Sequence, residues 1–160
     1  MYTLGDVPRK GSTIFRDRVA MFFEGKSITY GEMDSRVNCL ANAFMNLGLK
    51  KGDRLTILAE NTYKYMEVYF GASKSGMSVT PLNFRLSDGE LTYIINDCEA
   101  TLLFVGDGYE ERALGLKKDL KSIKTWISLD KRIDGYLFYE NLVKYASDTD
   151  PMVEVDENDM

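Results

Sequence analysis

Apolar positions along the chain follow two different periods, and the change from one period to the other marks the predicted elements. Four short runs are apolar through most of their length, which is typical of strands buried on both faces. Between these runs, apolar residues recur every three or four positions, as in amphipathic helices. The predicted strands cover residues 54–59, 79–82, 101–105 and 125–129.

The predicted helices carry recognisable signals at their ends. Thr29 and Glu32 have the spacing of a capping box, in which a hydroxyl and a carboxylate satisfy amide groups at a helix start, and Ser87 and Glu90 repeat it. Gly48 stands where a C-terminal cap belongs. The helices are expected over 30–47, 62–75, 88–98, 109–120 and 139–146, and the second should bury Met66, Tyr69, Phe70 and Ser73.

The order of these elements indicates the fold class. Helices between apolar strands supply the crossovers that parallel pairing needs, and they cover the sheet. We therefore expect an α/β fold with a doubly wound, mainly parallel sheet and flanking helices. Two short runs at 19–23 and 26–29 predict a small N-terminal β-hairpin before it.

Composition changes sharply near the end of the chain. Residues 1–146 are predicted to form one α/β subdomain, whereas 147–160 contain six carboxylates and no basic residue. Such a segment has little to bury, so an acidic linker or a frayed end is expected there.

Overall composition narrows the function classes. The chain has 160 residues, 44% of them hydrophobic, and a net charge of -5, which suits a globular protein and does not favour nucleic acid as a partner. It contains no histidine, so no imidazole base or metal ligand is present. Cys39 and Cys98 lie far apart and indicate reduced, buried thiols and a cytoplasmic location. We expect no transmembrane segment and no export signal, because no long apolar run occurs.

One glycine pair follows a predicted strand. Gly106 and Gly108 flank Asp107 at a strand-to-helix turn, where helix amides can cradle a phosphate. A dinucleotide fingerprint needs a third glycine, but Glu111 stands at that position. A plain turn is the favoured interpretation, and another ligand contact stays open.

Other polar and aromatic groups also have a structural interpretation. Lysines at helical spacing favour a solvated face, paired carboxylates favour surface charge, and a set of aromatic residues favours core and rim. The lysines are Lys117, Lys118, Lys121 and Lys124; the carboxylates are Glu110 with Glu111 and Asp156 with Glu157; the aromatics are Tyr63, Tyr65, Tyr69 and Phe70.

Several segments in one order carry a resemblance to a known family. They are SITYGEM (27–33), LANAF (40–44), LGLKKGDRL (47–55), ENT (60–62), GASKSG (71–76), PLNFRLS (81–87) and ELTYIIND (90–97). Together they resemble the opening of the AMP-forming acyl-CoA synthetases, which belong to the adenylate-forming, AMP-binding superfamily. Each segment also has a scaffold role, such as a turn into a strand or the end of a helix.

The resemblance implies a function for a longer parent protein. The parent would convert a carboxylic acid, ATP and CoA into acyl-CoA, AMP and pyrophosphate, with Mg²⁺ as cofactor. A medium- or long-chain fatty acid is the favoured substrate, with an aromatic acid close behind. In the family, a phosphate loop rich in Ser, Thr and Gly would follow residues 156–159, so we expect no catalytic residue in this piece and no activity from it alone.

The resemblance also implies one candidate binding site. In the acetyl-CoA synthetase branch, arginines in two loops approach the CoA nucleotide, and the matching positions here are Arg85 and Arg112. Glu110 stands where one of those arginines would be. A structural or solvated role is favoured for both.

Two other function classes remain. One is a stand-alone α/β binding or dimerisation module. Independently of this alternative, a piece that lacks its neighbouring subdomain is expected to expose apolar surface along a sheet edge or helix face and to self-associate as a homo-oligomer. The interpretation as a Rossmann-type oxidoreductase rests on the α/β alternation alone. Glu111, which stands in place of the third glycine of the fingerprint, contradicts it.

Overall fold

A computed structural model describes residues 3–156 and 159. The chain divides into two compact units. The sheet unit consists of Asp53–Glu60 and Val79–Asn141, and the helical unit consists of the described residues of Met1–Gly52, Asn61–Ser78 and Leu142–Met160.

The sheet unit is built on a five-stranded parallel sheet with the strand order β4-β3-β5-β6-β7. Each of the central strands is almost wholly buried, which explains why their sequences are apolar on both faces. The parallel register places Leu55 opposite Leu102, and Leu103 opposite Trp126. The strands are β3 (Arg54–Leu58), β4 (Ser78–Pro81), β5 (Leu102–Val105), β6 (Thr125–Ser128) and β7 (Leu137–Phe138).

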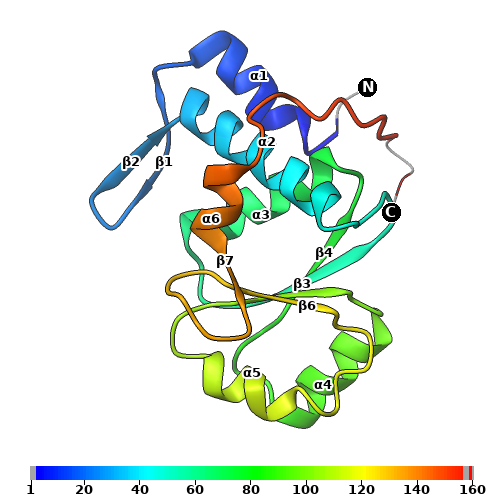
Figure 1. Ribbon diagram of the computed structural model, residues 1–160. Coiled ribbons are helices and arrows are strands. Elements are labelled where there is room, and N and C mark those ends of the chain that lie inside the picture. Colours follow the sequence, from blue (N-terminus) through cyan, green and yellow to red (C-terminus); the bar gives the residue numbers. More distant parts are fainter. Residues whose placement is uncertain (1–2, 157–158, 160) are drawn as a thin grey trace. The chain divides into compact units, whose positions relative to one another are not determined.

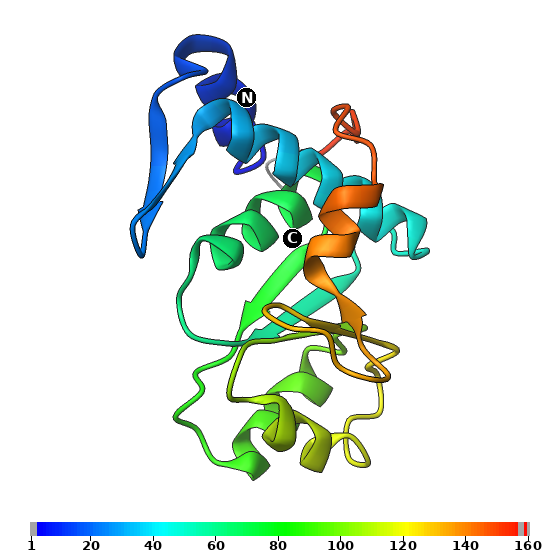
Figure 2. The same cartoon turned by 60° about the vertical axis from the view of Figure 1, so that its left-hand side comes forward.

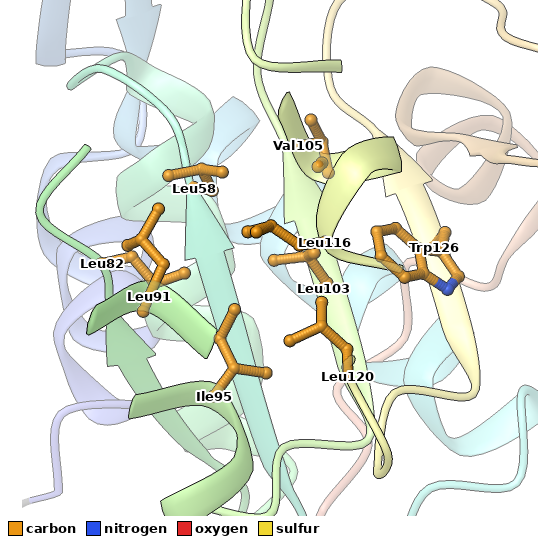
Figure 3. Close-up of a cluster of buried hydrophobic side chains, with 10 residues drawn as sticks. Leu58, Leu82, Leu91, Ile95, Leu103, Val105, Leu116, Leu120 and Trp126 are labelled. Atoms are coloured by element: carbon orange, nitrogen blue, oxygen red, sulfur yellow. The ribbon is translucent and has the colours of Figure 1, made fainter. Parts of the chain in front are cut away.

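Two helices of the sheet unit, α4 (Asp88–Asp97) and α5 (Glu110–Leu116), pack on one face of the sheet (Figure 1). Ser87 and Glu90 form the predicted capping box at the start of α4. A cluster of apolar side chains forms the core between these helices and the sheet (Figure 3). It contains Leu58, Leu82, Leu91, Ile95, Leu103, Val105, Ala113, Leu116, Leu120 and Trp126.

The helical unit begins with α1 (Asp6–Phe15), which is followed by an antiparallel hairpin of β1 (Val19–Phe23) and β2 (Lys26–Thr29). In both views the hairpin extends away from the helices of this unit (Figure 2). The predicted capping box of Thr29 and Glu32 starts α2 (Tyr30–Asn46), and α3 (Tyr63–Lys74) packs against α2.

Glycines end the two long helices of this unit in the left-handed conformation. Gly48 and Gly76 have φ of 86° and 69°. After α2, the amide of Leu49 donates to the carbonyl of Phe44, and after α3 that of Met77 donates to Ala72. This is the Schellman arrangement, which a residue with a Cβ adopts at a cost.

The predicted α/β class, the mainly parallel sheet with flanking helices and the N-terminal hairpin are confirmed. The sequence interpretation missed α1 and also β7, whose two residues are too few to show a period. The last helix, α6 (Tyr139–Tyr145), lies where a short helix was expected. The extent of one subdomain over 1–146 stays a prediction.

The expectation of a frayed end is wrong for residues 147–150. Asn42 on α2 donates from its side-chain amide to the carbonyls of Ser147 and Thr149, both at 2.8 Å. Asn38 donates to the carbonyl of Asp148 at 2.9 Å. Side-chain amides of α2 therefore hold the backbone of this segment. That 147–160 act as a linker remains a prediction.

Among the described residues, every helix is too short or too polar to cross a membrane.

Candidate functional site

The loops at the carboxyl ends of parallel strands form the usual ligand-binding edge of an open α/β sheet. In the sheet unit this edge consists of the residues after β3, β4, β5 and β6. Both candidate arginines belong to it, since Arg85 lies in the turn after β4 and Arg112 lies on α5, which follows β5.

The Arg112 guanidinium group is fully engaged with the turn between β4 and α4. Its Nε donates to Asp88 Oδ1 at 2.6 Å and its Nη1 to the Phe84 carbonyl at 2.6 Å, while Nη2 donates to the Leu86 carbonyl. All three guanidinium nitrogens are thus directed at this turn. Arg112 fixes the conformation of the turn that carries Arg85.

Arg85 itself is exposed, and no ion pair joins it to another described residue. Its backbone amide donates to Asn83 Oδ1 at 3.0 Å, and its guanidinium carbon lies 5.6 Å from the centre of the Phe84 ring. A cation held this way beside an aromatic ring can meet an anion or a planar group from solvent.

An aromatic pair extends this surface. The rings of Phe84 and Tyr109 lie 5.6 Å apart, and the Tyr109 hydroxyl donates to Glu60 Oε1 at 3.4 Å. Burial and the nearby Glu60 carboxylate raise the pKa of Tyr109. The structure therefore brings Glu60, Phe84, Arg85 and Tyr109 together at the strand ends, although sequence reasoning singled out only Arg85 among them. The sequence signal that could have identified Glu60, Phe84 and Tyr109 was their position, since each lies a few residues after the end of a predicted strand.

The glycine pair after β5 serves the packing of the turn. A Cβ at Gly106 would lie 2.7 Å from that of Ala59, so glycine allows two strand ends to approach closely. The Asp107 amide donates to Asp130 Oδ2 at 2.9 Å, and Asp107 Oδ1 lies 2.6 Å from Lys131 Nζ. The amide that a phosphate would need therefore already donates to the Asp130 carboxylate, which agrees with a plain turn.

The remaining candidates are mostly on the surface. The four lysines are exposed, but they lie beyond the end of α5, so the predicted helix over 109–120 is too long. The expectation that Glu110 is a solvated surface charge is wrong. Its side chain is 15% exposed, and its Oε1 lies 3.0 Å from Lys131 Nζ. Tyr65 and Tyr69 stack at 5.6 Å with Phe70 buried, as core and rim. Glu157 lies outside the described residues.

Sequence reasoning missed the buried charges of α3. Met66, expected on the inner face, is 44% exposed, whereas Lys64, Glu67 and Lys74 are buried. Glu67 accepts two hydrogen bonds from Arg36, at 2.6 and 3.0 Å. These three residues share one helix face with Gly71, and that spacing was the available signal.

Among residues 3–156 and 159, no three His, Cys, Asp or Glu side chains are grouped so that they could hold a metal ion.

Comparison with known proteins adds a family. A model described as an AMP-binding enzyme matches residues 10–160. The 4-hydroxybutyrate–CoA ligase 2 of Metallosphaera sedula is 31% identical over 108 residues, which are 68% of this chain and 20% of that protein. A medium/long-chain-fatty-acid–CoA and 3-oxocholest-4-en-26-oate–CoA ligase of Mycolicibacterium smegmatis is 27% identical over 141 residues, or 84% of this chain and 26% of that one.

A solved structure supports the same fold. The long-chain-fatty-acid–CoA ligase of Archaeoglobus fulgidus matches 99% of this chain and 34% of its own, with a TM-score of 0.88 and 20% identity. At this identity the likeness concerns the fold alone. The chain spans well under half the length of each of these proteins.

Proposed function

Because the chain belongs to the AMP-binding enzyme family, we propose that its parent protein activates a carboxylic acid with ATP and transfers the acyl group to CoA. The products would be acyl-CoA, AMP and pyrophosphate. The family match over residues 10–160 carries this proposal, and the named CoA ligases among the relatives support it. A carboxylate is a poor electrophile, and adenylation supplies a good leaving group before the thiol attacks.

The favoured acid is a medium- or long-chain fatty acid. One relative is named for medium- and long-chain fatty acids, but another is named for 4-hydroxybutyrate, a short hydroxy acid. An aromatic acid is the next candidate. The choice among them requires a substrate panel that contains all these classes.

Arg85 is the residue of this chain that we assign to CoA. It is exposed at the strand ends beside the Phe84 and Tyr109 rings, where a cation can meet a phosphate. Arg112 would act indirectly, because its donors hold the backbone of the same turn. ATP and Mg²⁺ would be bound by residues outside this chain.

The first experiment measures acid-dependent pyrophosphate release. A protein extended to its natural length should release pyrophosphate with at least one acid of the panel and consume CoA. Residues 1–160 alone should release none, because positioning and charge stabilisation supply most of the rate of nucleotidyl transfer. Release by the 160-residue chain would refute the assignment of the catalytic groups to other parts of the parent.

The second experiment tests Arg85 in the full-length protein. Arg85→Ala should raise the KM for CoA about tenfold, as expected for one lost charge-assisted hydrogen bond. The KM for pantetheine, which lacks the nucleotide, should stay unchanged. Lys118→Ala removes an exposed cation elsewhere in the sheet unit and serves as the matched control. An equal loss with both thiols would assign Arg85 a structural role.

The location of the parent and the self-association of this chain are also part of the proposal. We place it in the cytoplasm, which agrees with two free cysteines, and fractionation of cells tests the assignment. The 160-residue chain, which lacks the rest of the parent, would form a homo-oligomer through exposed apolar side chains such as Ile14 and Phe22. A strictly monomeric protein in sedimentation at high concentration would contradict it.

A further inference from the structure

The C-terminal strap, which we define as residues 147–156 and 159, has no regular secondary structure but is held at two points by charged side chains. Both points lie within the helical unit. The backbone contacts from Asn38 and Asn42 lie close to the first of them.

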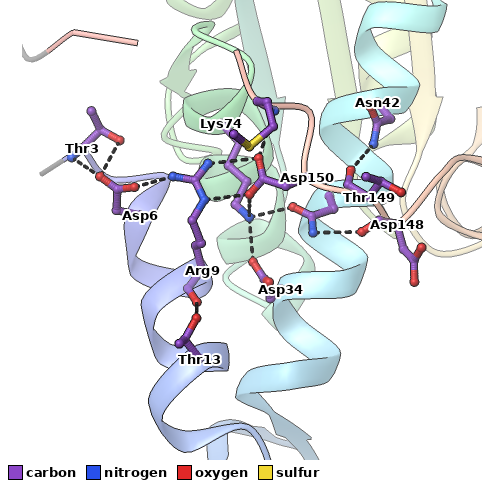
Figure 4. Close-up of polar contacts among 12 residues, drawn as sticks. Thr3, Asp6, Arg9, Thr13, Asp34, Asn42, Lys74, Asp148, Thr149 and Asp150 are labelled. Atoms are coloured by element: carbon purple, nitrogen blue, oxygen red, sulfur yellow. Dashed lines mark hydrogen bonds and ion pairs between the residues drawn. The ribbon is translucent and has the colours of Figure 1, made fainter. Parts of the chain in front are cut away.

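Asp150 is the first anchor (Figure 4). Arg9 on α1 donates to both of its carboxylate oxygens, at 2.7 and 3.0 Å, and Lys74 Nζ lies 3.3 Å from Oδ2. The amide of Met152 donates to Oδ1 at 2.9 Å. Burial alone would raise the pKa of Asp150, but Arg9, the Met152 amide and Lys74 hold it well below its usual range. The carboxylate therefore stays charged in the folded protein.

Lys74 is the cation beneath this anchor. Its side chain is fully buried, and its Nζ lies 2.6 Å from Asp34 Oδ1 and 2.6 Å from Asn38 Oδ1. Figure 4 shows Lys74 between α2 and the strap. Gly5 packs on it so tightly that a Cβ there would lie 3.0 Å from Lys74 Cγ. A lysine buried this deeply requires partners of opposite charge, and Asp34 and Asp150 supply them.

Lys51 is the second anchor. Its Nζ donates to the Glu154 carbonyl at 3.0 Å and lies 2.7 Å from Asp159 Oδ2. Gly76 makes this position possible, because a Cβ there would lie 2.8 Å from Lys51 Cγ. The Gly52 amide also donates to the Gly76 carbonyl at 2.8 Å, so the two turns are joined.

Both lysines belong to segments that carry the family resemblance, and each has a contact to the strap that a scaffold role alone does not require. We propose that Lys74 and Lys51 are positioning residues that fix the strap, and through it the phosphate-binding loop that would follow it in the parent protein. This inference rests on the proposed function.

The physical reason is preorganisation. A triphosphate is gripped by backbone amides that must already point inward, and a displacement of about 1 Å in such a site can cost a hundredfold in rate. A strap released from Lys74 or Lys51 would let the start of that loop move. ATP binding should then suffer, whereas the acid and CoA should bind as before.

The first test uses hydrogen exchange on the 160-residue chain. Asp150→Asn and Lys51→Glu should each speed exchange of the strap amides about tenfold, because local opening becomes easier. Asp148→Asn removes the same charge from the same segment, at a side chain that accepts a long hydrogen bond of 3.4 Å from the Ser35 hydroxyl, and should leave exchange unchanged. Unchanged protection in Asp150→Asn and Lys51→Glu would overturn the anchoring.

The second test uses steady-state kinetics of the full-length protein. Asp150→Asn and Lys51→Glu should raise the KM for ATP about tenfold, with the KM values for acid and CoA unchanged. The charge swap Lys51→Glu with Asp159→Lys re-forms the ion pair but not the hydrogen bond to the Glu154 carbonyl, so it should restore part of the loss. Equal losses for all three substrates, or no rescue, would overturn the positioning role.

The two tests also separate this inference from its premise. Absence of pyrophosphate release from the wild-type full-length protein with every acid would overturn the proposed function and, with it, the positioning role. The exchange result would still decide whether the strap is anchored.

Discussion

In the sheet unit, the side chains beneath α4 and α5 are leucine, isoleucine, valine, alanine and tryptophan, whereas the buried face of α3 in the helical unit includes Lys64, Glu67 and Lys74. Among the described residues, every buried charged side chain lies on α3. The sheet unit therefore buries apolar side chains beneath its helices, whereas the helical unit also buries charged ones.

This difference has a consequence for specificity. Apolar burial is non-directional and rewards any close packing of the right volume. A buried charge is costly unless its partners lie at defined positions, so the buried Lys74 is stable only where carboxylates lie beside it. The apolar core stabilises the sheet unit, and the charged contacts of the helical unit determine where the strap lies.

The largest expected effect tests the apolar core. Leu103→Ala removes a fully buried side chain of β5 and should lower the free energy of unfolding by about 4 kcal/mol, from lost burial and the remaining cavity. Leu114→Ala, at a side chain of α5 that is 59% exposed, should change it by less than about 0.5 kcal/mol. Denaturant unfolding followed by circular dichroism measures both. Equal losses would mean that the apolar cluster is not the main source of stability.

The next effect tests the buried charges. Lys74→Met leaves Asp34 and Asn38 without their cation and should lower the free energy of unfolding by about 3 kcal/mol. Lys50→Met makes the same change at an exposed position of the same unit and should have little effect. A Lys74→Met protein as stable as wild type would show that the helical unit does not depend on this cation.

A smaller effect depends on pH. The cations Arg9 and Lys74 face Asp150, and Asp6 and Asp34 bind the same two cations. The pKa of Asp150 is lower in the folded than in the unfolded state, so its stabilisation is complete above the unfolded pKa of about 4 and is lost as the pH falls further.

The matched variant isolates this contribution. The stability gap between wild type and Asp150→Asn should stay constant from about pH 7 to pH 5 and narrow below about pH 4. Unfolding curves at several pH values measure it. A gap that widened on acidification would contradict the ion pairs at Asp150.

The smallest expected effect compares one helix cap in each unit. Thr29→Ala and Ser87→Ala each remove a side chain that accepts from the amide three residues on, and each should cost about 1 kcal/mol. Thermal unfolding measures both losses. Similar values would show that the units differ in their cores and share their local capping energetics; a loss several times larger in one unit would show otherwise.

Local rules predicted much of the fold. The two capping boxes and the glycine at the end of α2 were identified from residues a few positions apart, and the structure contains the bonds they predict. Period and apolar content also placed four of the five strands of the parallel sheet, β3 to β6. The candidate site was only partly accessible, since Arg85 was identified but its aromatic neighbours Phe84 and Tyr109 were not.

The remaining features depend on contacts between distant parts of the chain. Arg9 and Asp150 are 141 positions apart, and Lys74 and Asp150 are 76 apart. Arg112 could be assigned its partners only when α5 and the turn after β4 were placed together. Hydrophobic periodicity counts a lysine as a surface residue, so it assigned α3 the wrong inner residue in Met66.

The sequence by itself therefore determined the α/β class, the positions of four of the five strands of the parallel sheet, two helix caps and the family resemblance. The caps and the strands are readable from sequence because their hydrogen bonds and side-chain periods are complete within one element, and the α/β class follows from the order of those elements. Only the tertiary structure decided which charges are buried, which arginine is free to meet solvent and where the strap is held. Each of those outcomes requires a partner supplied by another element, because a charge is stable out of water only when an opposite charge or a hydrogen-bonding group is brought to it.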